Sequence, residues 1–81
     1  MKINIRKSAI KDLKRISLND RQKIHSKILI LSKFPNISNV KKLTNFEPAY
    51  RLRVGNYRIL FDVSETTIEI GRVLHRKDSY K

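Results

Sequence analysis

Four arginines in the second half of the chain have the type and spacing needed to hold a phosphate. Arg51 and Arg53 alternate with apolar residues, Arg58 follows a few positions later, and Arg76 lies near the C-terminal end. Guanidinium groups bind phosphates through bidentate, charge-assisted hydrogen bonds, so such a cluster predicts a phosphodiester site. The alternative is that these are ordinary solvent-facing strand residues, partly neutralised by carboxylates. The candidate carboxylates are those of Asp62, Glu69 and Glu47.

Two further residues near the C-terminal end extend this candidate site. Tyr80 is the penultimate residue, and an aromatic ring beside a basic groove can stack on an unpaired base while arginines hold the backbone. His75 adds a group that exchanges a proton near neutral pH. The competing interpretation of Tyr80 is that it belongs to a frayed terminus. The competing interpretation of His75 is that it ends a strand and forms its hydrogen bonds with nearby residues. His25, in the first half of the chain, is interpreted as a surface residue.

A β-hairpin is the element that must position the first three arginines. Residues 49–63 contain two alternating runs on either side of Gly55-Asn56, a pattern typical of a hairpin with a two-residue loop. In that register Arg53 lies opposite Arg58, and both share one face with Arg51. Like charges in directly opposed positions repel, so this arrangement favours an anionic ligand. The other face takes Tyr50, Leu52, Val54, Tyr57, Ile59, Phe61 and Val63.

Two helices are predicted before the hairpin. Ser8 is expected to be the N-cap of the first helix, and Asn19 or Asp20 that of the second. The second helix is expected to end near Lys33, because Pro35 restricts the residue before it to extended geometry. The apolar residues at helical spacing are Ala9, Ile10, Leu13 and Ile16 in the first helix, and Ile24, Ile28 and Leu31 in the second.

The remaining segments complete an α+β layout in the order β-α-α-β-β-β. Residues 2–6 and 67–75 alternate as strands, the latter with a bulge near Gly71, and the connection 35–46 includes a short extended piece around residues 40–43. We expect two N-terminal antiparallel helices on one face of a small, mostly antiparallel sheet, within a single domain over residues 1–81. The other face of the sheet is then open.

Composition narrows the classes of function. The chain has 81 residues, a formal net charge of +12 and no cysteine. The absence of cysteine excludes a disulfide framework and thiolate metal or redox chemistry, and no apolar run has the length of a membrane span or a signal-peptide core. The default expectation is a soluble, cytoplasmic protein. So high a charge predicts a polyanionic partner, with nucleic acid the first candidate and an acidic protein the second.

The sequence resembles a known family in two places. The run Tyr50-Arg51-Leu52-Arg53-Val54-Gly55-Asn56-Tyr57-Arg58-Ile59-Leu60-Phe61 and the ending Val73-Leu74-His75-Arg76-Lys77-Asp78-Ser79-Tyr80 are similar to the signature of the RelE/ParE toxin superfamily, and more closely to its RelE branch. The resemblance implies the toxin of a type II toxin–antitoxin pair that enters the ribosomal A site, contacts rRNA and cleaves mRNA. It further implies attack by a nucleotide 2′-OH on the adjacent phosphate, without a metal or other cofactor. The implied partner is an antitoxin, whose covering segment we expect to be acidic because the chain is basic.

The resemblance also assigns roles by position. Arg51 and Arg53 match a basic pair that binds phosphate and helps to activate the nucleophile. Arg58 and Arg76 match arginines that stabilise the charge developing on the scissile phosphate. Tyr80 matches a tyrosine that stacks on the substrate.

The general base is the point at which this sequence departs from the family pattern. Some members have lysine at the basic pair, and a guanidinium is a poor base. His75 could compensate, Glu47 is a weaker candidate, or the arginines could act by positioning and charge stabilisation alone. Two other functions stay open: a ParE-like inhibitor of DNA gyrase, and a non-catalytic basic module that binds nucleic acid.

Overall fold

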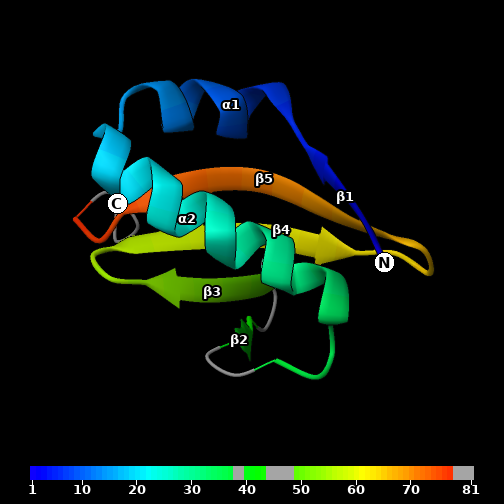
Figure 1. Ribbon diagram of the computed structural model, residues 1–81. Coiled ribbons are helices and arrows are strands. Elements are labelled where there is room, and N and C mark those ends of the chain that lie inside the picture. Colours follow the sequence, from blue (N-terminus) through cyan, green and yellow to red (C-terminus); the bar gives the residue numbers. More distant parts are fainter. Residues whose placement is uncertain (38–39, 44–48, 78–81) are drawn as a thin grey trace.

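The fold consists of a five-stranded sheet with two helices on one side (Figure 1). The computed structural model describes residues 1–37, 40–43 and 49–77. The elements are β1 (Lys2–Ile5), α1 (Lys7–Lys14), α2 (Leu18–Ile30), the 3-10 turn η1 (Leu31–Lys33), β2 (Val40–Lys42), β3 (Tyr50–Val54), β4 (Tyr57–Val63) and β5 (Thr67–His75). The spatial order is β1-β5-β4-β3-β2, with β1 parallel to β5 and the other pairs antiparallel. The α+β prediction is confirmed, including the short extended piece, which is β2.

The hairpin has the register that the sequence predicts. Val54 pairs with Tyr57, Arg53 with Arg58 and Leu52 with Ile59. Gly55 has a φ of 57°, the left-handed conformation that a two-residue loop requires and that glycine adopts without steric cost. A one-residue slip would move every side chain to the opposite face. This register therefore fixes which side of the sheet carries the arginines.

The helices begin at different residues from those predicted. Arg6 is the N-cap residue of α1, and the Ser8 hydroxyl instead donates to the Gly71 carbonyl oxygen at 2.6 Å. The N-cap of α2 is Ser17, whose Oγ accepts from the Asp20 backbone N–H at 3.5 Å. Both N-cap predictions are wrong. A Ser hydroxyl at the true N-cap reaches the backbone N–H three residues on, whereas the predictions placed each cap inside its helix.

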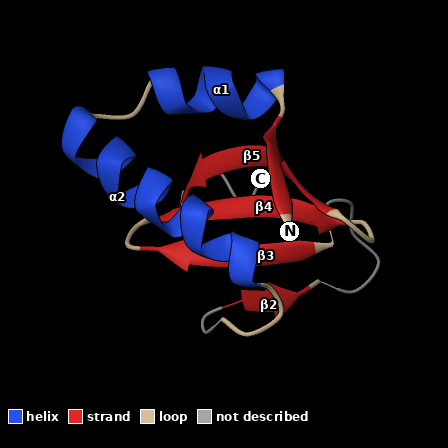
Figure 2. Ribbon diagram, turned by 45° about the vertical axis from the view of Figure 1, so that its right-hand side comes forward, coloured by secondary structure: helices blue, strands red, loops and turns tan. Residues whose placement is uncertain are grey.

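Helix α2 supplies most of the helical contribution to the core. Ile24, Ile28 and Leu31 are at most 1% exposed, which confirms the predicted stripe, and they face the apolar side of the sheet. Burying each such side chain stabilises the fold by about 1.5–3 kcal/mol. In α1 only Ala9 is buried, and Ile10 is 41% exposed, contrary to the prediction. Figures 1 and 2 show the reason, since α1 lies along the β5 side of the sheet while α2 crosses over β4 and β3.

Strand β5 contains the expected bulge. Leu60 pairs with Arg72 and Phe61 with Ile70, so Gly71 is the extra residue. The bulge restores the alternation, with Ile70 and Val73 both buried on the helix side. Within the described residues, no helix is long and apolar enough to cross a membrane.

Candidate phosphate site

The open face of the sheet gathers three arginines from two neighbouring strands. Arg53 and Arg58 are directly opposed in β3 and β4, and Arg51 lies on the same face opposite Leu60. Their exposure is graded: Arg53 is exposed, Arg51 is half-buried and Arg58 is only 3% exposed. The predicted cluster is therefore present, and its members occupy three different environments.

Arg58 differs most from a solvent-facing strand residue. Among the residues that the structure describes, it is the one buried charged or polar residue. Removing a guanidinium from water is costly, so folding has fixed this charge in the middle of the sheet against a desolvation penalty. A charge held in place in this way needs no reorganisation when an anion arrives. Burial thus argues against the interpretation of Arg58 as ordinary surface charge.

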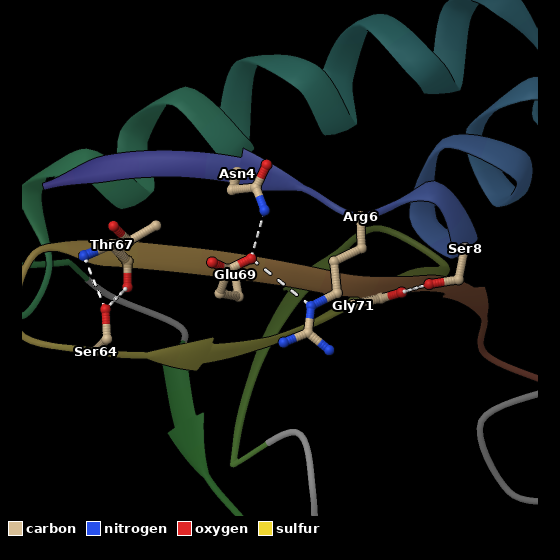
Figure 3. A network of polar contacts seen from close by, with 7 residues as sticks. All are labelled: Asn4, Arg6, Ser8, Ser64, Thr67, Glu69 and Gly71. Carbon is tan, nitrogen blue, oxygen red and sulfur yellow. Dashed lines mark hydrogen bonds and ion pairs between the residues drawn. The ribbon is translucent and has the colours of Figure 1, made fainter.

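Two of the carboxylates proposed as neutralising groups are held elsewhere. An Asp62 oxygen accepts from the Ala49 backbone N–H at 2.8 Å. Glu69 accepts from Asn4 Nδ2 at 2.6 Å and lies 3.7 Å from Arg6 Nε, so its partners come from β1 and the start of α1 (Figure 3). Glu47 lies outside the described residues. In the described ranges, neither Arg51 nor Arg53 takes part in an ion pair.

Arg76 is positioned beside the hairpin turn. Its backbone N–H donates to the Asn56 carbonyl oxygen at 2.6 Å, which ties the residue after β5 to the loop between β3 and β4. Arg76 therefore belongs to the same end of the sheet as Arg53 and Arg58. Tyr80 lies outside the described residues, so its predicted stacking position stays a prediction.

His75 lies on the other side of the sheet from the arginines. It pairs with Tyr57, on the helix-facing side, and the two rings meet edge to face with centroids 5.2 Å apart. Its Nδ1 accepts from the Lys77 backbone N–H at 3.2 Å, a bond that requires an unprotonated Nδ1. The sequence predicts that His75 extends the arginine cluster. The structure does not show this, because strand alternation directs His75 and the arginine side chains to opposite faces of the sheet.

A clamp between α1 and β5 was missed from the sequence. Asp12 accepts from Arg72 Nε at 2.8 Å, from a terminal Arg72 nitrogen at 3.1 Å and from the Val73 backbone N–H at 2.9 Å. Strand β1 stops pairing with β5 at Ile70. Beyond that point the Asp12 bonds replace a strand neighbour along the edge of β5, together with the bond from the Ser8 hydroxyl to Gly71, which Figure 3 shows. The signal was Ser8 and Asp12 at a spacing of four, one face of a helix. The clamp holds the strand that leads to Arg76.

Known proteins resemble the whole chain. The model of a protein family described as the ParE toxin of the type II toxin–antitoxin system parDE matches residues 3–80. Toxin RelE3 of Methanocaldococcus jannaschii is 38% identical, in an alignment that covers 99% of this chain and 96% of that protein.

Solved structures show the same relationship. A RelB–RelE antitoxin–toxin complex from Methanococcus jannaschii is 38% identical with a TM-score of 0.79, covering 94% of this chain and 93% of that one. The toxin–antitoxin complex RelBE2 from Mycobacterium tuberculosis is 28% identical with a TM-score of 0.79, covering 93% and 96%.

Proposed function

The chain belongs to the RelE/ParE toxin superfamily and is RelE-like, and from this premise we propose that it is a ribosome-dependent endoribonuclease that cleaves mRNA in the A site. The observation that carries the proposal is Arg58, a buried guanidinium directly opposite the exposed Arg53 on the face of the sheet away from the helices. Such a pair offers one fixed and one adaptable cation to a phosphodiester. No other feature of the described residues concentrates positive charge in so fixed a geometry.

The proposed reaction is an intramolecular transesterification. The 2′-oxygen of a nucleotide attacks its own 3′-phosphate, the bond to the next 5′-oxygen breaks, and the products are a 2′,3′-cyclic phosphate and a 5′-hydroxyl. The proton leaves the 2′-OH and one is delivered to the departing 5′-oxygen. Arg51 and Arg53 hold the phosphate, while Arg58 and Arg76 stabilise the charge that develops on it. Tyr80 orients the nucleotide by stacking.

Charge stabilisation and positioning are proposed to carry the reaction without a metal. His75 faces the helix side, and the guanidiniums are poor bases, so the described residues supply electrostatic stabilisation better than proton transfer. The role of His75 as a base is tested by His75→Gln. A shifted pH–rate profile would support that role, and an unchanged profile would leave the arginines as the machinery.

We further propose that the partner is an antitoxin and that both act in the cytoplasm. The similar structures from Methanococcus jannaschii and Mycobacterium tuberculosis are toxins in complex with their antitoxins. The net charge of +12 supports an acidic antitoxin segment by complementarity.

Primer extension on stalled ribosomes with an open A site tests the function. Three templates are compared: the mRNA on ribosomes, the same mRNA alone, and a ribosome-bound mRNA with a 2′-deoxy nucleotide at the cleavage position. We expect cleavage only of the first. Cleavage of the 2′-deoxy template would contradict the mechanism, and no cleavage by folded protein would contradict the function.

Gyrase inhibition is the second candidate, because the matching family model describes ParE toxins. A supercoiling assay with purified DNA gyrase separates the two functions. Inhibition of supercoiling by a protein that leaves ribosome-bound mRNA intact would favour the gyrase target.

A further inference from the structure

Two hydrogen bonds hold the backbone around Arg76, at the point where β5 ends. Its own N–H donates to the Asn56 carbonyl oxygen at 2.6 Å, which places the end of β5 beside the loop between β3 and β4 (Figure 1). The next backbone N–H, that of Lys77, donates to Nδ1 of the His75 ring at 3.2 Å. The planar peptide units before and after the Arg76 Cα are therefore both anchored, and together they fix the direction of the Arg76 side chain. We call residues 75–77 the β5 end turn.

The bond from Lys77 to His75 has the pattern of a common turn. An asparagine or aspartate side chain that accepts from the backbone N–H two residues later closes an Asx turn. Nδ1 of a histidine is as many bonds from the backbone as the asparagine Oδ1, and here it accepts from the N–H two residues later. His75 thus closes the β5 end turn with a ring nitrogen in place of an amide oxygen.

Tyr57 orients the ring that supplies this acceptor. The two residues are paired across β4 and β5, and their rings meet edge to face with an angle of 88° between the planes. Tyr57 is itself packed against the hydrophobic core. An edge-to-face contact with a fixed partner restricts rotation of the His75 ring, so Nδ1 stays directed at the Lys77 N–H.

The surroundings of His75 determine what its protonation would do. The ring lines a pocket of about 370 Å³, and the charged and titratable groups that face it there are Asp12, Arg15, Tyr57 and Arg72. Among these lining residues Asp12 is the one carboxylate, and it already accepts from Arg72 and from the Val73 backbone N–H. Protonation of His75 would therefore break the bond to Lys77 without offering the ring an uncommitted carboxylate.

We propose that His75 is a positioning residue, whose unprotonated Nδ1 holds the β5 end turn and thereby aims Arg76. A proton on Nδ1 removes the lone pair that accepts the bond. Imidazole changes its charge between about pH 5 and 8, so the turn is held at the upper end of this range and released toward the lower end. The step from Arg76 to cleavage rests on the proposed function, whereas the hydrogen bond does not.

This role differs from that of a general base. A base exchanges a proton with the substrate, whereas the turn acceptor keeps its lone pair on the Lys77 N–H. His75→Gln removes both functions, because the glutamine oxygen lies one bond further along, at the level of Nε2. His75→Asn tells them apart, because Oδ1 can accept from Lys77 and cannot act as a base.

Nuclear magnetic resonance of the whole protein tests the hydrogen bond without reference to cleavage. Long-range proton–nitrogen spectra at about pH 8 are expected to show the His75 proton on Nε2 and none on Nδ1. As the pH falls, the protection of the Lys77 amide from solvent exchange should drop together with the titration of His75. The Arg76 amide, whose acceptor does not titrate, should keep its protection. A neutral ring protonated on Nδ1, or Lys77 protection that does not follow His75, would overturn the proposal.

The pH dependence of mRNA cleavage on ribosomes tests the positioning role. Single-turnover rates are compared for the original protein, His75→Asn, His75→Gln and the control His25→Asn, which changes an exposed histidine of α2. At about pH 8 we expect His75→Asn to cleave nearly as fast as the original and His75→Gln about tenfold more slowly. Between about pH 8 and 6 the original and His25→Asn should lose about tenfold relative to His75→Asn, since an amide acceptor does not titrate.

The possible outcomes separate the roles once circular dichroism has shown that each variant is folded. Equal losses in His75→Asn and His75→Gln would overturn the positioning role and favour a base. A constant ratio of the original rate to the His75→Asn rate across this pH range would also contradict it. A protein with the expected Lys77 and His75 spectra that cleaves no mRNA would refute the nuclease function, and with it the link to cleavage, and would leave the hydrogen bond standing.

Discussion

The two ends of the open sheet face differ in how their charges are satisfied. At the end where β1 and β5 begin, Glu69 has Asn4 and Arg6 as partners, and Asp62 holds the Ala49 backbone. At the hairpin end Arg51, Arg53 and Arg58 gather, and Arg76 is held close by. The first end uses its polar groups to hold strands and loops together. The second end gathers arginines on the face of the sheet away from the helices, where the proposed function places the substrate phosphate.

Under the proposed function, this difference separates structural polar groups from substrate-binding ones within a single sheet. The Glu69 and Asp62 carboxylates already accept hydrogen bonds within the fold, so they contribute to strand register and to loop closure. Arg58 is a buried guanidinium on the same face as Arg51 and Arg53, so folding holds its charge where the proposed function places a phosphate. Variants at the hairpin end should therefore impair cleavage, whereas variants at the end with Glu69 and Asp62 should affect folding.

Replacing Arg58 is expected to have the largest effect. Arg58→Met keeps much of the apolar volume of the side chain and removes the charge, so the fold should persist while single-turnover cleavage on ribosomes falls on the order of 10²- to 10³-fold. Arg58→Lys retains the charge without the planar guanidinium fork, so its cleavage rate should lie between those of the original protein and Arg58→Met. Circular dichroism and thermal melting check folding. A folded Arg58→Met protein with the original rate would show that the buried cation is not part of the site.

Replacing Arg53 is expected to have a smaller effect, because its side chain is exposed. Arg53→Gln should weaken binding of a non-cleavable mRNA by roughly tenfold and reduce the slope of affinity against salt by about one. Lys11→Gln, on the exposed face of α1, is the control. An unchanged salt slope in Arg53→Gln would mean that this guanidinium does not contact a phosphate.

The Asp12 clamp is expected to affect stability more than chemistry. Asp12→Asn removes the charge that binds Arg72, so the free energy of unfolding should fall by about 1–3 kcal/mol and the Val73 amide should exchange faster with solvent. Cleavage should fall only severalfold, through looser positioning of Arg76. Urea denaturation and hydrogen exchange measure the two effects. Unchanged exchange at Val73 would contradict the clamp.

Glu69→Gln is expected to have the smallest effect. The pair with Arg6 is partly exposed, so its loss should cost no more than about 1 kcal/mol. Cleavage should not change, because the Glu69 carboxylate lies at the end of the face where polar groups hold strands and loops together. A large loss of cleavage in this variant would erase the distinction between the two ends.

The hairpin was predictable because its pattern is local. Alternation and Gly55-Asn56 together determine which residues oppose each other, and the pairing of Arg53 with Arg58 followed from them. The bulge at Gly71 was predictable for the same reason, since the alternation slips there.

The remaining features depend on contacts distant in sequence. The helix N-caps were misplaced because Ser8 bonds to a β5 carbonyl, 63 positions away, and Ser17 was overlooked. The parallel pairing of β1 with β5 and the Asp12 clamp join the two ends of the chain, which periodicity does not report. His75 was grouped with the arginines because it is close to Arg76 in sequence, although alternation places it on the other face.

Primer extension on stalled ribosomes with Arg58→Met and Glu69→Gln side by side tests the central claim most directly. Both variants are first matched for folding by circular dichroism, and each removes one charge from the same sheet face. The account predicts that cleavage in the A-site codon falls on the order of 10²- to 10³-fold in Arg58→Met and persists unchanged in Glu69→Gln. Equal cleavage by the two variants, whether retained or lost, would contradict it.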